Sequence, residues 1–299
     1  AEVADHTMAC VYATHGYYVR LSGNNELNMY NLNNYEGDAY TYGLYAENGD
    51  ITIIELSSDS SGSLKHTGSG AYASATAPGS PSSDAVRVIS AAVYVKDGNV
   101  DIKGGTLDLA GGTASIQEGR YSNDSVHVES YGICAYTDQQ ISSVNISGCT
   151  VIAKGGEAFN RSTDSDAQKH AYSAGIRVSA GKLNITGGEV TASTLQTGSD
   201  YCQGIIAEGK IAITPKKNNK AITWQIGNKA SEITSSGTVI AGDGATEIGA
   251  RAKYFHSQEV DYIAVDSVTL DPSSLALDIG DESQLTASVS PDNATEKTV

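Results

Sequence analysis

The stretch GIRVSAGKLNITGGEVTA, residues 175–192, sets the pattern from which the fold of this chain is predicted. It holds three short segments in which aliphatic residues alternate with other residues, and glycines separate the segments. The aliphatic pairs are Ile176 with Val178, Leu183 with Ile185, and Val190 with Ala192. Alternation with a period of two places each pair on one face of a strand, and glycine permits a tight corner. The stretch therefore predicts three short strands joined by sharp turns.

The same pattern recurs along the chain. Taking the small residue before the first strand as the start, the copies begin at Gly43, Ala92, Gly132, Gly175 and Gly204. Repeated three-strand units of this kind coil into a parallel β-solenoid, with stacked ladders of side chains on each face. The expected fold is all-β, with a parallel β-helix over residues 43–262. Residues 1–42 are expected to form an N-terminal cap or an irregular first coil.

The repeat makes two detailed predictions. One ladder should stack Ile133, Ile176 and Ile205, and a second should stack Ile102, Ile146 and Ile185, all pointing inward. The corner glycines Gly98, Gly181 and Gly209 should adopt a positive φ or a similarly restricted turn. Polar segments at about 63–90, 112–130, 155–173 and 193–202 are expected to be loops that leave one corner of successive coils.

The composition restricts the partners. The 299 residues include 19 Lys and Arg against 35 Asp and Glu, so the formal charge of −16 argues against nucleic acid and anionic lipid. The chain has no run of 18 apolar residues, so a membrane-spanning segment is not predicted. The chain has 17 Tyr but 2 Phe and 1 Trp. Tyrosine keeps a polar end, so these rings are expected mainly outside, where they can stack on sugars or simply satisfy β-propensity.

The recurring pattern of aliphatic pairs and paired glycines resembles the right-handed parallel β-helix of the pectate-lyase-like superfamily. Within it, the chain is similar to bacterial surface modules described as carbohydrate-binding or adhesin-like. The resemblance implies a non-catalytic extracellular protein, secreted or attached to the cell surface, whose partner is a polysaccharide or a host or cell-surface glycan. The alternatives are a polysaccharide lyase or glycoside hydrolase of this fold, and a structural stalk.

Residues 263–299 have a different sequence pattern from the repeats. They show the order Val268, Leu270, Pro272, Leu277, Gly280, Leu285 and Ala287. This run resembles the opening of a bacterial immunoglobulin-like domain of group 2, and about 35 residues are less than half of such a domain. The expected fold class is thus a β-helix followed by a partial, truncated Ig-like β-sandwich segment, with further domains C-terminal to it.

Five tyrosines are the candidate carbohydrate-binding residues. Tyr131, Tyr172 and Tyr201 fall in the segments expected to be loops, and Tyr45 and Tyr94 share one outward position on neighbouring coils. Stacked on adjacent coils, Tyr45 and Tyr94 would lie about 4.8 Å apart. Such a pair either forms a flat sugar platform or stabilises the sheet as a cross-strand pair.

Four aspartates are the candidate calcium ligands. Asp124, Asp164, Asp166 and Asp200 lie in the same polar segments, where stacked loops would bring their oxygens together. Several oxygens within reach are what Ca²⁺ requires, although Asp is also common in solvated turns.

Catalytic residues are not predicted. No Asp-Asp pair occurs, and Arg177, alone on a regular strand, is interpreted as a solvated surface charge. The four cysteines lack metal spacing and are expected to be mostly free thiols, with Cys134 pointing outward and Cys202 in a loop.

Overall fold

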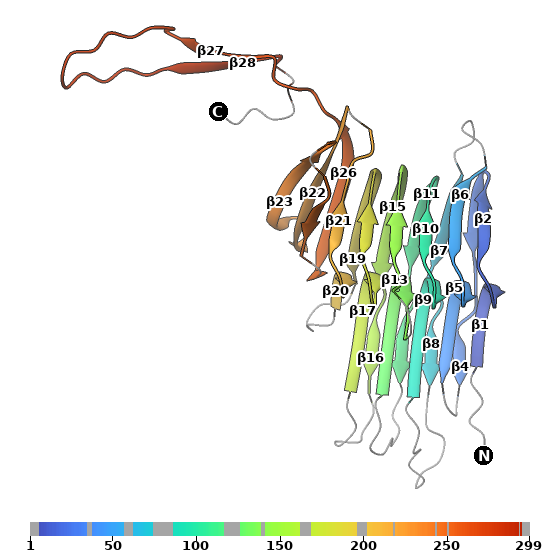
Figure 1. Ribbon diagram of the computed structural model, residues 1–299. Coiled ribbons are helices and arrows are strands. Elements are labelled where there is room, and N and C mark those ends of the chain that lie inside the picture. Colours follow the sequence, from blue (N-terminus) through green and yellow to red (C-terminus); the bar gives the residue numbers. More distant parts are fainter. Residues whose placement is uncertain are drawn as a thin grey trace.

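The computed structural model describes residues 6–34, 38–56, 62–73, 86–116, 126–138, 141–161, 169–195, 202–217, 219–242, 244–249, 251–292 and 294. Over these ranges every regular element is a β-strand, and most strands follow one another around an elongated coil (Figure 1). No helix capable of crossing a membrane is present in this described part of the chain.

Three sheets run along the coil and enclose its main core. Sheet A contains β1 (His6–Ala13), β5 (Ala39–Glu47), β9 (Val86–Lys96), β13 (Val126–Tyr136), β17 (Lys169–Val178), β20 (Cys202–Ala207) and β25 (Arg251–Ala252). Sheet B contains β2 (Tyr17–Leu21), β6 (Ile51–Glu55), β10 (Val100–Ile102), β14 (Val144–Ile146), β18 (Leu183–Ile185), β21 (Ile211–Ile213) and β24 (Thr246–Ile248). Sheet C contains β3 (Asn24–Leu27), β7 (Ser63–Thr67), β11 (Thr106–Ala110), β15 (Cys149–Gly155), β19 (Gly188–Thr194), β26 (Tyr254–Asp261), β22 (Lys220–Lys229) and β23 (Glu232–Ile240). From β1 to β21 the paired strands are parallel, as expected of a β-solenoid.

The two predicted isoleucine ladders are confirmed. Ile133 pairs with Ile176, and Ile176 with Ile205, in sheet A. The second ladder runs through sheet B in the same way, from Ile102 to Ile146 and Ile185. No member exceeds 1% exposure, so both ladders lie in the dry core.

A fourth sheet was not predicted. Sheet D contains β4 (Leu32–Asn34), β8 (Ala71–Ala73), β12 (Ala114–Ile116) and β16 (Ala158–Asn160). It packs on the N-terminal halves of the sheet A strands and encloses a second core of small residues, including Ala71, Val88, Ala114, Ile116 and Val128. Much of the segments expected to be loops is therefore strand, because alanine-rich strands of three residues carry little hydrophobic alternation.

Buried hydroxyls join the two cores. Ser130 donates to the Gly112 carbonyl at 2.7 Å and accepts from the Gly156 amide at 2.9 Å. In the preceding coil, Ser90 likewise accepts from the Gly112 amide, and in the following one Ser173 donates to the Gly156 carbonyl. Each serine thus satisfies backbone groups at the corner between sheets C and D, where no strand partner is at hand.

Of the two alternatives predicted for the corner glycines, a positive φ is found at one of the three, and the other two lie at bends where a side chain would clash. Gly181 has a φ of 157°, whereas Gly98 and Gly209 do not have a positive φ. A Cβ at Gly98 would lie 2.3 Å from the Gly49 carbonyl oxygen, and one at Gly209 would lie 2.3 Å from the Gly181 oxygen. Glycine is needed at these two corners because successive corners stack backbone against backbone.

The C-terminal end of the coil changes strand direction. β24, β25 and β26 pair antiparallel to β21, β20 and β19. Residues 237–240 belong to β23, which forms an antiparallel hairpin with β22. Antiparallel strands thus cover the last coil, and Trp224 lies against Gly237 within this hairpin.

Residues 267–290 form a separate hairpin of β27 (Ser267–Asp271) and β28 (Thr286–Ser290) that extends away from the coil (Figure 1). Val268 pairs with Val289 and Leu270 with Ala287, so these four apolar side chains share one face. Val268 and Leu270 are each 48% exposed. Alternation is therefore present in this segment, but its apolar face is open to solvent.

Candidate functional site

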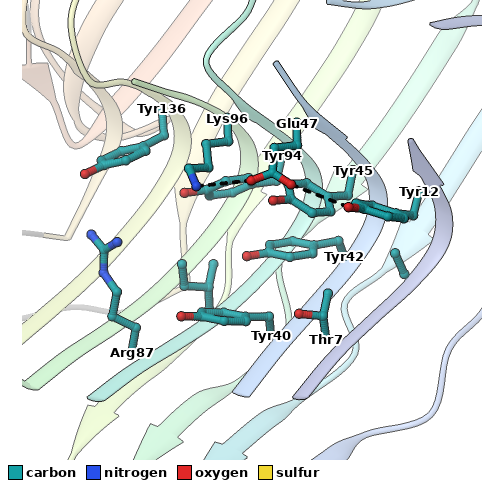
Figure 2. A pocket seen from close by; sticks show the side chains of 12 residues that line it. Thr7, Tyr12, Tyr40, Tyr42, Tyr45, Glu47, Arg87, Tyr94, Lys96 and Tyr136 are labelled. Carbon is teal, nitrogen blue, oxygen red and sulfur yellow. Dashed lines mark hydrogen bonds and ion pairs between the residues drawn. The ribbon is translucent and has the colours of Figure 1, made fainter. Parts of the chain in front are cut away.

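The outer face of sheet A carries a groove of about 640 Å³ (Figure 2). Its lining comes from four neighbouring strands: Thr7, Ala9 and Tyr12 on β1; Tyr40, Tyr42, Tyr45 and Glu47 on β5; Arg87, Ile89, Tyr94 and Lys96 on β9; and Tyr136 on β13. Groove residues alternate with core residues along each strand, but the phase changes once: on β5, Tyr40 and Tyr42 face the groove before Gly43, and Tyr45 and Glu47 face it after Leu44. Six rings of one residue type thus gather on one face.

The tyrosine rings form a connected stack. Tyr12, Tyr45 and Tyr94 occupy the same register position on β1, β5 and β9. Ring centroids lie 5.1 Å apart between Tyr12 and Tyr45, 4.6 Å between Tyr42 and Tyr45, and 4.9 Å between Tyr42 and Tyr94. The solvent-exposed fraction of these tyrosines increases from 4% at Tyr94 to 53% at Tyr12. Tyr42 and Tyr94 therefore form the buried floor of the groove, and Tyr12 is the most exposed ring of the stack.

Three phenols of the stack, Tyr42, Tyr45 and Tyr94, remain neutral over the physiological pH range. Burial, followed by the charge of Glu47, raises the pKa of Tyr45 to about 12. Burial also raises the pKa of Tyr42 and that of Tyr94 well above their usual range. The groove consequently offers hydroxyls that can both donate and accept hydrogen bonds, next to apolar ring faces.

Charged groups border the rings. Lys96 Nζ lies 3.2 Å from Glu47 Oε1, and the Tyr12 hydroxyl donates to Glu47 Oε2 at 3.4 Å. Across the groove, the Arg87 guanidinium lies 5.4 Å from the centre of the Tyr136 ring. Figure 2 shows the hydroxyls of Tyr40, Tyr42 and Tyr94 directed toward the side of the groove on which Arg87 lies.

A second cluster lies on the same face, one to two coils further along. Arg177 on β17 is packed between the rings of Tyr131 and Tyr172, with its Cζ 5.3 Å from each centroid. Its Nη1 lies 3.5 Å from Glu129 Oε1 and also donates to the Tyr131 hydroxyl. The side chains of Arg177 and Glu129 are 16% and 4% exposed, so this ion pair is largely desolvated.

Two histidines extend this second cluster. The rings of His127 and His170 stack with centroids 5.1 Å apart, and His127 Nδ1 lies 3.9 Å from Glu129 Oε1. Burial lowers the pKa of His127, and the charges of Arg87 and Arg177 add to the lowering, while Glu129 opposes it. His127 is therefore disposed to be neutral near pH 7.

The structure separates the five candidate tyrosines. Tyr45 and Tyr94 are register neighbours facing outward, with centroids 5.9 Å apart in an edge-on arrangement. Tyr131 and Tyr172 lie within strands β13 and β17, not in loops, and Tyr131 is 0% exposed. Tyr131 is hence covered by its neighbours and does not stand on an exposed rim. Tyr201 lies outside the described residues.

The candidate calcium ligands Asp124, Asp164, Asp166 and Asp200 also lie outside the described residues. Within the described ranges, no group of three or more His, Cys, Asp or Glu side chains is placed to hold a metal ion. The calcium prediction therefore stays a prediction.

Three smaller expectations can be compared with the structure. Arg177 is wrongly interpreted as a solvated charge, because Glu129 pairs with it and two rings cover it. Cys202 lies in strand β20 and is buried, so its assignment to a loop is wrong. Cys134 faces the outer side of sheet A but is also buried there, and none of the four cysteines forms a disulfide bond.

Sequence reasoning missed most of the groove and the carboxylate of the second cluster. Tyr12, Tyr40, Tyr42, Arg87 and Glu129 were not singled out, because each precedes the small residue that was taken as the start of a repeat or lies in the first coil. The alternation of apolar residues at Val86 and Val88, repeated at Val126 and Val128, could have extended the strands upstream. That extension would have assigned Arg87 and Glu129 to the outer face.

No family model, no curated protein and no solved structure matches this chain. The case for function therefore depends on the groove and its chemistry.

Proposed function

We propose that this chain is a non-catalytic, extracellular carbohydrate-binding protein, and that the tyrosine-lined groove on sheet A is its glycan site. The observation that carries the proposal is the stack of Tyr12, Tyr45, Tyr42 and Tyr94 in a groove of about 640 Å³. The volume falls within the range typical of small-molecule sites, about 300 to 1,000 Å³.

A sugar ring fits this combination of groups. Its C–H face is apolar and packs on an aromatic face, while its hydroxyls require both donors and acceptors at the edge. The groove supplies ring faces from Tyr12 and Tyr45 and polar partners from Glu47, Lys96 and Arg87. The cross-strand role of Tyr45 and Tyr94 is compatible with this, since a pair that stabilises the sheet also provides a rigid platform.

The solenoid and the C-terminal hairpin support the other two parts of the proposal, the β-helix surface module and the Ig-like segment. The β-solenoid agrees with the resemblance to right-handed β-helix surface modules, and the exposed alternation of the β27–β28 hairpin is what the opening strands of an Ig-like domain would present. We therefore include in the proposal a bacterial Ig-like group 2 segment from about residue 263 that connects the coil to further domains.

The test is a glycan-array screen followed by titration calorimetry with the best ligand. Tyr12→Ala and Tyr45→Ala should each weaken binding by up to about tenfold, because each removes one ring face. The matched controls are Tyr18→Ala and Tyr30→Ala, which truncate rings that are 70% and 87% exposed and lie outside the groove.

Retention of full affinity in the Tyr12→Ala, Tyr45→Ala double variant would remove the groove from the proposal. An array without any bound glycan would contradict glycan binding itself and leave the structural stalk. The same samples should be assayed for new reducing ends and unsaturated products, since either product would instead identify a hydrolase or a lyase.

A further inference from the structure

The charge of the groove differs from that of the chain. The chain as a whole carries a formal charge of −16. The charged residues that line the groove are Arg87, Lys96 and Glu47, so the lining has a net charge of +1. A positive groove on a strongly acidic protein indicates a local preference for an anionic group.

The excess positive charge can be assigned to one side chain. Lys96 is paired with Glu47 at 3.2 Å, and in the neighbouring cluster Arg177 is paired with Glu129 at 3.5 Å. Among the described residues, the Arg87 guanidinium forms no ion pair with any carboxylate. Its side chain is hydrogen-bonded to that of Tyr136, and the Glu129 carboxylate attracts its charge from beyond ion-pair distance.

Arg87 is also held in place. Its backbone amide donates to Asp38 Oδ1 at 2.7 Å, its side chain is half-buried, and its guanidinium packs on the Tyr136 ring. The hydroxyls of Tyr42 and Tyr94 point toward its side of the groove, whereas the Tyr40 hydroxyl, which points the same way, already donates to Asp38 (Figure 2). A fixed planar donor next to the neutral hydroxyls of Tyr42 and Tyr94 is suited to an oxyanion, which takes hydrogen bonds from the guanidinium and from these phenols.

We propose that the groove binds a saccharide bearing an anionic group, a carboxylate or a sulfate ester, and that this group sits on the Arg87 guanidinium. The inference rests on the proposed glycan-binding function and narrows the class of glycan. The stacked rings of Tyr12 and Tyr45 hold the sugar by its face, and Arg87 selects it by charge. Because the protein as a whole repels polyanions, short oligosaccharides should bind better per residue than long polymers.

The experiment compares matched probes on the full chain. Hyaluronan and oligogalacturonate hexasaccharides supply carboxylates, and their carboxyl-reduced forms are the neutral counterparts. A carrageenan oligosaccharide supplies sulfate without carboxylate, and maltohexaose serves as a neutral reference. The anionic form should bind about 10- to 100-fold more tightly than its neutral counterpart, as expected for a hydrogen bond between charged groups.

Variants of Arg87 then locate the preference. Arg87→Gln should abolish the difference between the anionic and neutral forms, because it lowers the affinity for the anionic form to that for the neutral one. Arg87→Lys should restore part of the difference, because it keeps the charge but loses the planar fork. The control is Arg20→Gln, which removes an exposed arginine from β2 on another sheet and should change neither.

The outcomes separate this inference from the proposed function. Equal binding of anionic and neutral forms by the parent protein would overturn the anionic preference and leave glycan binding intact, and this comparison needs no variant to fold. Binding of none of these probes, together with an empty glycan array, would overturn the proposed function itself. A preference for carrageenan over the uronates, lost in Arg87→Gln, would support the inference and identify the group as a sulfate.

Discussion

The two faces of sheet A differ in how strictly their residues repeat. At one register level the inward row reads Leu44, Val93, Ile133, Ile176 and Ile205, all at most 1% exposed. The next row, on the outer face, reads Tyr45, Tyr94, Cys134, Arg177 and Ile206. Inward residues pack against equivalents of their own kind, whereas outward residues change chemistry from coil to coil. The comparison teaches that packing between coils enforces repetition on the core face, whereas the outer face is free to vary, as the proposed binding site requires.

The largest expected effect is on the inward face. Ile146→Ala should lower the free energy of unfolding by about 2 to 5 kcal/mol, because it opens a cavity between Ile102 and Ile185 in a dry ladder. Chemical denaturation measures the change. Ile141→Ala, at a side chain that is 82% exposed, should cost far less. Equal losses in the two variants would break the distinction between the faces.

An outward residue that is nevertheless buried should give the next largest effect. Arg177→Met should destabilise the protein by about 2 to 3 kcal/mol, because it leaves the Glu129 carboxylate buried without its cation. Combining it with Glu129→Gln should recover part of that loss. A double variant no more stable than Arg177→Met, measured by the same denaturation, would show that the two side chains are not coupled.

The serine corner tests the boundary between the two cores. Ser130→Ala should cost about 1 to 2 kcal/mol, because the Gly156 amide and the Gly112 carbonyl both lose a buried partner. Ser22→Ala, at an exposed position, serves as the reference. Hydrogen exchange should also accelerate at the Gly156 amide, and unchanged protection there would contradict the assigned role of the hydroxyl.

The smallest effect is a pH dependence contributed by two histidines. His66, on β7 of sheet C, points inward, and His127, on β13 of sheet A, points outward; both have a lowered pKa, mainly through burial. In the unfolded chain each titrates near pH 6.5, so the unfolded state binds more protons on acidification. The contribution of these two histidines to stability is therefore fully present above about pH 6.5. It is lost as the pH falls toward their lowered pKa values in the folded state.

Thermal unfolding at pH 7.5 and 5.5 measures this dependence. His127→Gln should reduce the drop in melting temperature between the two pH values. His66→Gln, at the inward histidine, should also reduce this drop. His15→Gln, at an exposed histidine, should leave the drop unchanged. A drop unaffected by either buried histidine would assign the pH dependence to other groups.

The sequence alone was sufficient for the repeating core. Period-two alternation and recurrent glycine predicted the register of Ile102 with Ile146 and of Ile133 with Ile176, because each inward side chain packs against the equivalent position of the next coil. It was also sufficient to identify Tyr45 and Tyr94 as outward neighbours. Local periodicity encodes these features, so a single chain displays them.

Only the tertiary structure decided the groove and the second core. Arg177 meets Glu129, and Arg87 meets Tyr136, because coiling brings residues of different repeats together on a face whose residues need not repeat. Sheet D could not be predicted from the sequence, because strands such as Ala71–Ala73 and Ala114–Ile116 are too short for periodicity to distinguish them from loops. Alternation along the chain determines which side chains point inward, but the contacts between outward side chains depend on the lengths of the segments between coils, which no periodicity fixes.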